Sequence, residues 1–339
     1  MTNIIIRSDE TNAAATALVL AAADNAVVLL GETLKPGQHT FRYLGGERTA
    51  RLIALDELDQ TARTVGIVFA EGESVPAGIN DVVYSTSPDL FVIIGGGITA
   101  VAEAIDAAQA NNLDPSRILH VGGFFVNGTA ADVKAEKRNV MAGFLGQGTP
   151  DTIVKLAQES LPQISIGEGP AVALSSVNAF VHLPPMILNA MNVERGENLR
   201  FYVEGFGDSV CRLLEALDQD RLRLGDALGY SLVPIPELMD RSRGPEGMPG
   251  STLREKINSY PPYRTIKLPS SLHHRYLAHE LRSTFAPMYQ MARAVDLEVP
   301  TIESVLRIGE ILLDDQIVPG ASEAARKFLD LTQAKAGAA

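Results

Sequence analysis

The chain has 339 residues, more than a single hydrophobic core usually supports, so two domains are expected. Its composition, 46% hydrophobic and 21% charged, is that of a soluble globular protein. The net charge of −12 argues against a nucleic-acid partner, because a polyanion is repelled unless cations gather on one face. Lysine and arginine are dispersed instead, and we expect Arg221 and Arg223, near Arg212, to lie on a solvated helix face. The single Cys211 excludes an internal disulfide and fits a reducing compartment.

The sequence predicts neither a membrane span nor a secretion signal. The most apolar helical run, residues 13–23, is well below the roughly 20 residues that a bilayer requires. The N-terminus has no basic segment, and its few apolar residues end at Arg7. We therefore expect a cytoplasmic protein.

Short β-branched runs alternate with alanine-rich helical stretches in the first half of the chain. In order, we predict a strand at 4–6, a helix at 13–23, a strand at 26–30, a hairpin within 39–55, strands at 64–69, 81–84 and 90–94, a helix at 100–111 and a strand at 118–121. This alternation predicts a mostly parallel sheet with helices on both faces, a doubly wound α/β domain. In such sheets ligands bind at the carboxyl ends of the strands.

From about residue 185 the pattern changes to helices without strands. Apolar residues at helical spacing predict helices at 209–217, 219–228, 284–295, 301–312 and 321–331. The glycine- and proline-rich segment 241–250 is predicted to be a surface loop that could cover a site.

One histidine has a distinctive setting in the stretch from Asn178 to Asn189. His182 follows the apolar, β-type run 177–181, and Pro184 and Pro185 are expected to end that run before a helical segment begins. A histidine between a strand end and a helix start can exchange a proton near neutral pH. On these residues alone, a histidine that is merely hydrogen-bonded at a domain junction explains the pattern equally well.

This stretch resembles the octopine/nopaline (opine) dehydrogenase family, whose second half opens with an Asn-x-x-x-His-x-Pro signature. The likeness continues, in the family's order, through residues 200–205, 209–218, 269–277 and 299–303. It implies a Rossmann-like domain at residues 1–177 and an all-α substrate domain at residues 178–339, of the type found at the C-terminus of 6-phosphogluconate dehydrogenase.

The resemblance also assigns roles to residues near a Ser-Leu-x-His-Arg-Tyr-Leu motif at 271–277. Arg275 falls on the family's substrate-binding arginine, whose planar fork suits a carboxylate. Glu280 occupies the position of an aspartate that orients the signature histidine, and Asn178 supports the substrate or the nicotinamide end of the cofactor. Without the resemblance, Arg275 and Glu280 would be interpreted as a surface pair on a helix.

Metal binding and nucleophilic catalysis find little support in the sequence. His274 and His279 are five residues apart, outside the spacings of three and four that face together on a helix, so no metal site is expected. No Gly-x-Ser-x-Gly motif occurs, and Cys211 lies in an apolar helical stretch.

The first strand does not run into the Gly-x-Gly-x-x-Gly turn of nicotinamide dehydrogenases. Residues 8–12 read Ser-Asp-Glu-Thr-Asn, so Asp9 and Glu10 stand where two phosphate charges would arrive. This predicts weak or unusual nicotinamide binding. The sequence Gly95-Gly96-Gly97-Ile-Thr-Ala does match the fingerprint after a later strand, but it lacks an acidic residue about 20 positions on. Cofactor contact and tight packing of a helix are both open explanations of these glycines.

The resemblance implies an NAD- or NADP-dependent reaction, in which NADH or NADPH reduces the imine formed between an amino acid and a 2-oxo acid, or the reverse oxidation takes place. In that hypothesis Arg275 holds a substrate carboxylate, His182 exchanges the proton, and Glu280 orients His182. We expect the partner to be a small molecule that carries a carboxylate, and neither a nucleic acid nor a membrane. The oligomeric state is left open, with a homodimer as one option.

The missing first glycine turn motivates a hypothesis of a different class. A redox-inactive family member without any cofactor could use His182 and Glu280 for cyclisation, isomerisation or elimination on an amino-acid-derived substrate. A non-catalytic binding protein, or the silent partner of an active paralogue, is the third interpretation.

Overall fold

The computed structural model describes residues 2–8, 11–31, 33–70, 75–242 and 248–336. The chain divides into two compact units. The first comprises Met1–Gly96 and Glu103–Val172, and the second comprises Gly97–Ala102 and Ala173–Ala339. The predicted change from the α/β to the helical domain, between residues 177 and 178, falls close to this division.

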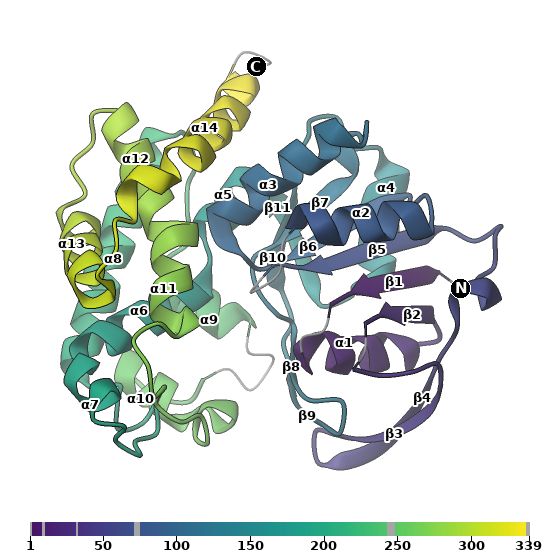
Figure 1. Cartoon of the computed structure of the whole chain (residues 1–339), viewed down its shortest axis with the longest axis horizontal. Helices are drawn as coiled ribbons and strands as arrows, with labels where there is room; N and C mark the ends of the chain where they lie inside the picture. The colour runs from purple at the N-terminus through teal and green to yellow at the C-terminus, as the bar shows by residue number, and fades with distance from the viewer. Residues whose placement is uncertain (1, 9–10, 32, 71–74, 243–247, 337–339) are drawn as a thin grey trace. The chain divides into compact units, whose positions relative to one another are not determined.

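The first unit is built on two sheets with helices between and around their strands (Figure 1). Its strands and helices are β1 (Asn3–Arg7), α1 (Thr11–Ala21), β2 (Ala26–Leu30), β3 (Gly37–Tyr43), β4 (Gly46–Leu52), β5 (Thr64–Phe69), α2 (Val75–Ser85), β6 (Leu90–Ile94), α3 (Gly97–Ala110), β7 (Ile118–Val121), β8 (Val126–Gly128), β9 (Asp132–Glu136), β10 (Val140–Phe144), α4 (Asp151–Ser160) and β11 (Ile164–Glu168). The first six residues of α3 are counted with the second unit.

The main sheet has the strand order β11-β10-β7-β6-β5-β1-β2, and all its neighbours are parallel except β7 and β10. The chain moves from β1 to β2 in one direction and from β5 through β6 to β7 in the other. Because such crossovers are right-handed, α1 lies on one face of the sheet and α2 and α3 on the opposite face (Figure 1). The strands β5 and β6 are buried at every residue, as expected for a parallel sheet covered on both faces.

The second sheet has the order β4-β3-β9-β8, and α1 packs against both sheets. β3 and β4 form the predicted hairpin, paired from Gly37 with Leu52 to Tyr43 with Gly46. The alanine-rich face of α1 lets the two sheets approach, and its residues join the core of this unit.

The strand predicted at residues 81–84 is wrong, because these residues belong to α2. The side chains of Val75, Ile79 and Val82 are buried, with spacings of four and three residues, so the segment has one apolar helical face. A short β-branched run does not distinguish a buried strand from a buried helix.

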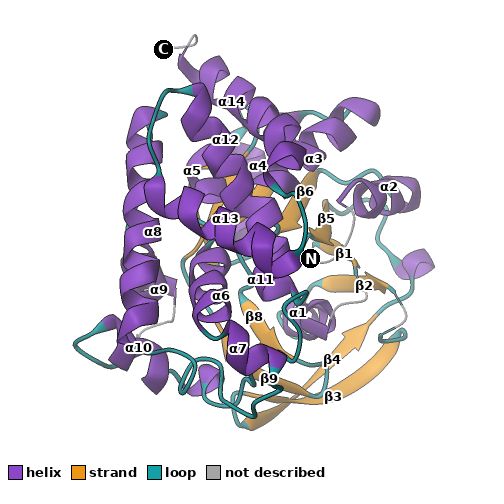
Figure 2. Cartoon of the chain, turned by 60° about the vertical axis from the view of Figure 1, so that its left-hand side comes forward, coloured by secondary structure: helices purple, strands orange, loops and turns teal. Residues whose placement is uncertain are grey.

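The second unit is drawn as helices joined by loops (Figure 2). Helix α5 (Gly169–Leu174) crosses the division, since its first four residues are counted with the first unit. The helices that follow in the second unit are α6 (Val177–Leu188), α7 (Ala190–Glu194), α8 (Asp208–Ala227), α9 (Ile235–Ser242), α10 (Leu253–Ser259), α11 (Arg275–Glu280), α12 (Ala286–Ala294), α13 (Pro300–Leu313) and α14 (Ser322–Ala336). A π-helical turn, Leu281–Phe285, joins α11 to α12. The helices predicted at 209–217 and 219–228 are one continuous helix, α8, and the first two residues of the predicted loop 241–250 end α9. Residues 243–247 lie outside the described chain.

Arg221 is fully buried, so its predicted place on a solvated helix face is wrong. Its guanidinium donates to Asp218 Oδ1 at 2.7 Å, to Ser175 Oγ at 3.0 Å and to the carbonyl of Val233 at 2.7 Å. A charge can be buried when a counter-ion and hydrogen bonds replace its water. These bonds fasten α8 to Ser175, between α5 and α6, and to Val233, before α9.

One helical stretch, residues 169–188, is long and apolar enough to cross a membrane by composition alone. In its most apolar window 78% of residues are buried inside the protein, which is the behaviour of a core helix.

His120 on β7 holds the end of the neighbouring strand β6. Its Nε2 donates to the carbonyl of Gly95 at 3.0 Å, and the side chain is fully buried. Burial lowers the pKa of His120 from 6.5 to about 4, so the folded protein keeps this imidazole neutral.

We expect this histidine to make the fold acid-sensitive. The unfolded chain takes up a proton at His120 below about pH 6.5 and the folded chain only near pH 4, so stability falls as the pH drops through this window. Between pH 7 and pH 5 the loss should be about 2 kcal/mol. The His120→Gln variant can still donate to Gly95 but does not titrate. Its free energy of unfolding, measured in urea at pH 7 and at pH 5, should therefore fall by correspondingly less. An unchanged pH dependence in the variant would contradict the assignment.

Candidate functional site

His182 lies in the middle of α6, so its predicted position after a β-strand is wrong. Pro184 and Pro185 lie within the same helix instead of ending the run. The helix persists because it is buried on nearly every side: Phe180, Val181 and Leu183 are at most 1% exposed. An apolar segment of this kind gains its stability from packing, and that gain outweighs the hydrogen bonds that the prolines remove.

The helical conformation explains the spacing of the Asn-x-x-x-His signature. Asn178 and His182 are four residues apart, so they lie on the same face of α6, one turn from each other. Asn178 is half-buried and His182 is 4% exposed.

His182 is hydrogen-bonded to Glu280, the last residue of α11. His182 Nδ1 lies 2.7 Å from Glu280 Oε1, and both side chains are buried. Because a carboxylate only accepts, the proton of this bond belongs to Nδ1, and Nε2 is the ring nitrogen that can gain or lose a proton. Glu280 is 3% exposed, which excludes the alternative of a surface pair with Arg275.

Tyr276 is a site residue to which the sequence assigned no role. Its ring stacks on the imidazole of His182, with 3.8 Å between centroids and 17° between planes. The stack and the Glu280 hydrogen bond together fix the rotation of the imidazole. The sequence feature that could have pointed to Tyr276 is its position beside Arg275 in the 271–277 motif.

Arg275 opens α11, and its guanidinium carbon lies 5.4 Å from the centroid of the Tyr276 ring. His274 precedes it as the N-cap: its Nδ1 accepts a hydrogen bond from the backbone N–H of Tyr276 at 3.3 Å. Burial, followed by the charge of Arg275, lowers the pKa of His274, which favours the neutral ring that this cap requires. The helix that carries Arg275, Tyr276 and Glu280 is therefore capped without an added negative charge.

The segment around residue 200 packs against Tyr276 of the motif at residues 271–277. Phe201 N–H donates to the carbonyl of Ile266, and Leu268 N–H donates to that of Leu199, so the two segments run side by side. The buried ring of Phe201 lies 5.1 Å from that of Tyr276. The stretch 200–205, which carries part of the family resemblance, thus packs behind the residue that stacks on His182.

The glycines at 95–97 form the turn between β6 and α3. Their φ angles of 79°, 74° and 60° lie in the left-handed region that favours glycine. A side chain on Gly97 would meet Thr284 Oγ1 at 2.5 Å and the carbonyl oxygen of Ser283 at 3.1 Å. Packing therefore accounts for the absence of a side chain at Gly97, whereas cofactor contact at Gly95 and Gly96 stays a prediction.

The main sheet has the strand order that suits a nucleotide. The connections after β1 and β5 leave in opposite directions, and ligands of such sheets bind at the carboxyl ends of the strands that flank this reversal. Asp9 and Glu10, which the sequence placed against the diphosphate, lie outside the described residues. So does Glu32, which comes two positions after β2 in the sequence.

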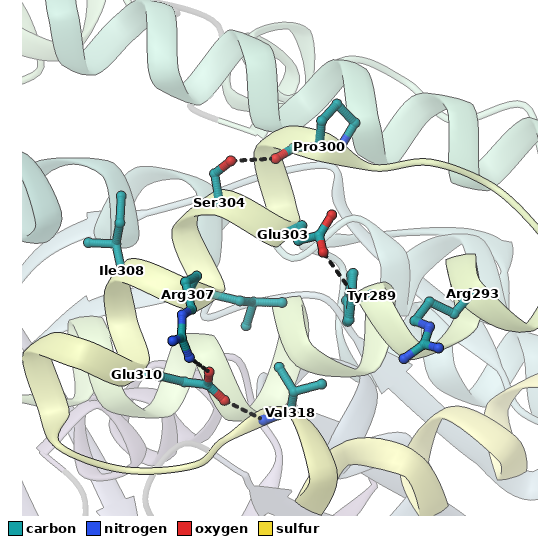
Figure 3. Close-up of a pocket in the computed structure, with 10 residues that line it drawn as sticks. Tyr289, Arg293, Pro300, Glu303, Ser304, Arg307, Ile308, Glu310 and Val318 are labelled. Atoms are coloured by element: carbon teal, nitrogen blue, oxygen red, sulfur yellow. Dashed lines mark hydrogen bonds and ion pairs between the residues drawn. The ribbon is translucent and has the colours of Figure 1, made fainter.

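A cavity of about 670 Å³ lies on the helical unit among α12, α13 and the segment at Val318 (Figure 3). Two pairs of its polar groups are in contact: Tyr289 donates to Glu303 at 3.0 Å, and Arg307 lies 3.8 Å from Glu310. None of the predicted site residues lines it. No group of three or more histidine, cysteine or acidic side chains able to hold a metal occurs in the part of the chain that the structure describes. Burial raises the pKa of the Cys211 thiol to about 11, which disfavours the nucleophilic thiolate.

Comparison with solved structures identifies the fold as a Rossmann-like α/β domain with an all-helical domain. Octopine dehydrogenase in complex with NADH and L-arginine matches with a TM-score of 0.72 at 12% identity, over 98% of both chains. Yersinopine dehydrogenase with NADP⁺ bound matches with a TM-score of 0.64 at 13% identity, over 97% of this chain and 99% of that one. The predicted fold class is confirmed.

The helical domain carries the sequence similarity to known families. Residues 170–313 match the model of the NAD/NADP octopine/nopaline dehydrogenase alpha-helical domain. The chain is 30% identical over 142 residues to opine dehydrogenase of Arthrobacter sp. (strain 1C), and 26% identical over 153 residues to vitopine synthase of Allorhizobium ampelinum. These alignments cover 42% and 44% of this chain but only 39% and 41% of the relatives. Residues 170–313 are therefore similar to the helical domain of the octopine/nopaline dehydrogenases, as the sequence resemblance indicated.

We expect the length of the acid at position 280 to matter as much as its charge. Glu280→Asp shortens the side chain by about 1.5 Å, which breaks the 2.7 Å contact with His182 unless the backbone moves. Glu280→Gln keeps the length and removes the charge. Both variants should lower kcat roughly 10- to 100-fold with little change in KM, the usual effect of losing a group that orients a histidine. Full turnover in Glu280→Asp would show that the contact is dispensable.

Proposed function

We propose that the protein is an opine-dehydrogenase-type oxidoreductase, which reduces the imine of an amino acid and a 2-oxo acid or oxidises the resulting secondary amine. The observation that carries the proposal is the buried His182–Glu280 hydrogen bond, formed inside the segment that matches the alpha-helical domain of octopine/nopaline dehydrogenases. Because the sequence alignments span about two-fifths of the curated relatives, their activities support the proposal by analogy.

The proton chemistry follows from the geometry of His182. Nδ1 donates to Glu280, so only Nε2 can exchange a proton with the substrate. In the reductive direction Nε2 protonates the imine nitrogen, which makes the adjacent carbon electrophilic. The imidazole then returns to its neutral form. In the oxidative direction the same nitrogen removes the proton of the secondary amine, and the resulting imidazolium is stabilised by the carboxylate of Glu280.

Arg275 binds a carboxylate of the substrate in this proposal. The guanidinium offers a two-pronged donor at the start of α11, on the same helix as Glu280. Both the amino acid and the 2-oxo acid carry carboxylates, and an acidic protein needs a local cation to attract them. Asn178, one turn before His182, is proposed to support the substrate or the nicotinamide end of the cofactor.

The cofactor is proposed to be a nicotinamide dinucleotide, which supplies or accepts the hydride when bound. The order of the main sheet fits such a ligand at the ends of β1 and β5. Among the structural neighbours, octopine dehydrogenase is known with NADH and yersinopine dehydrogenase with NADP⁺. We infer a preference for NAD from Glu32, because an acid after β2 accepts from the ribose 2′-hydroxyl and repels a 2′-phosphate.

These neighbours do not favour the alternative of a redox-inactive protein with a pure acid–base reaction. The side chains in the first strand-to-helix turn still predict weak binding of the dinucleotide. The partner is then a small, carboxylate-bearing substrate, and cytoplasmic localisation and a homodimer stay predictions.

Titration with NADH and NADPH, followed by an assay of NADH consumption with pairs of amino acids and 2-oxo acids, tests the function. We expect micromolar or weaker binding with NADH preferred, and consumption only when both substrates are present. His182→Ala should reduce turnover roughly 100- to 10,000-fold, as for other general acids, without loss of folding cooperativity. Absence of binding to either nucleotide would support the redox-inactive alternative.

We also expect Arg275→Lys to weaken substrate binding by roughly 1–3 kcal/mol, since lysine keeps the charge but loses the two-pronged geometry. Arg254→Lys is a matched control, because Arg254 is half-exposed and pairs with Asp208 at 3.1 Å on the same unit. Only the first variant should raise KM for the 2-oxo acid. Equal binding of an acid and its methyl ester by the native protein would refute the role of Arg275.

A further inference from the structure

The π-helical turn, Leu281–Phe285, follows Glu280 without a break. Its wide hydrogen bond runs from the backbone N–H of Ala286 to the carbonyl of Leu281, five residues back. Such turns are rare, less stable than α-helix and concentrated at functional sites, so a local reason is required for this one.

The reason lies in what the two ends of the turn contact. Glu280 reaches His182, and the ring of Phe285 lies 5.1 Å from that of Phe180. Both contacts are made with α6. In an α-helix, residues five apart point about 140° away from each other. A π-helical turn brings residue i+5 back above residue i, so that Glu280 and Phe285 face α6 together.

Two glycines from distant parts of the sequence leave room for this turn. A side chain on Gly309 of α13 would collide with the side chain of Leu281. A side chain on Gly97 of α3 would meet Thr284 and Ser283, both of which are buried. Thr99, in the same first turn of α3, points its hydroxyl at the carbonyls of Arg282 and Ser283, 3.4 Å from each.

We propose that Gly97 is a positioning residue for the His182–Glu280 pair, acting through the π-helical turn. Gly97–Ala102 is counted with the helical unit, so these contacts lie within one compact body. Gly97 lies outside the family-matched segment 170–313 and belongs to the triplet that resembles a phosphate-binding fingerprint. The absence of a side chain at Gly97 lets the backbone of Ser283 and the hydroxyl of Thr284 approach, which fixes the direction of Glu280. The catalytic consequence rests on the proposed function, whereas the geometric consequence does not.

The test compares two glycine substitutions that impose the same backbone strain. Gly97→Ala, at φ +60°, adds a methyl group against Thr284, and Gly196→Ala, at φ +66° in the same unit, adds one in open space. We expect Gly97→Ala to lower kcat roughly 10- to 100-fold, as expected when a group that orients a histidine is displaced, with an unchanged dissociation constant for NADH. Gly196→Ala should change neither.

The second readout is the imidazole itself, which requires no turnover. The chain has six histidines, so the Nδ1–H proton signal of His182 can be assigned by its loss in His182→Ala after ¹⁵N-histidine labelling. This signal should shift or broaden in Gly97→Ala and stay in place in Gly196→Ala. Gly97→Ala combined with Thr284→Ala removes the closest collision and should restore the signal in part, relative to Thr284→Ala alone.

A loss of NADH affinity in Gly97→Ala with an unchanged His182 signal would overturn the proposal and make Gly97 a cofactor residue. Equal effects of the Gly97 and Gly196 substitutions would overturn it as well, by reducing Gly97 to a source of backbone strain. If the native protein bound no NADH, the proposed function would fail, and the imidazole signal would still decide the role of Gly97.

Discussion

The buried hydrogen bond between His182 and Glu280 constrains the structure around it. A carboxylate that is 3% exposed has lost most of its water, so its position depends on the groups that replace it. The imidazole is one such group, and it is itself held between Glu280 and the ring of Tyr276. Because low dielectric strengthens the bond while making an unpaired partner costly, α6 and α11 must keep a fixed separation. The capped start of α11 and the π-helical turn at its end both serve that requirement.

Much of the α/β domain could be predicted from the sequence, because its parallel strands are continuous buried β-branched runs. The segments at 64–69, 90–94 and 118–121 are strands as predicted. The same criterion was wrong at 81–84 and at 177–181, where the buried segments are helical. The period of the pattern decides such cases only when one face is clearly polar, and in α6 only Asn178 and His182 are polar. Two prolines reinforced the wrong interpretation, although a well-packed helix tolerates them.

The site was predictable only as far as its local motifs extend. Asn178, His182, Arg275 and Glu280 were predicted through the family resemblance, which preserves order and spacing, and the structure brings His182 and Glu280 together. The burial of Arg221 was missed because no local pattern marks its three simultaneous bonds to Asp218, Ser175 and Val233. Tyr276 belongs to the motif at 271–277, but the sequence assigned it no role, because ring stacking depends on the distance between two helices.

The glycine triplet at 95–97 shows why a fingerprint has to be read together with its surroundings. Its spacing matches a phosphate-binding turn, and all three residues adopt the left-handed conformations that make glycine useful there. The atoms that approach Gly97 are nevertheless those of Ser283 and Thr284, nearly 190 residues further along the chain. Packing thus accounts for Gly97, whereas cofactor contact at Gly95 and Gly96 stays a prediction. The strand order reverses at β1 and β5, a second region where such sheets bind nucleotides, and there the sequence lacks glycines. A fingerprint match therefore has to be weighed against the atoms that pack on each of its glycines.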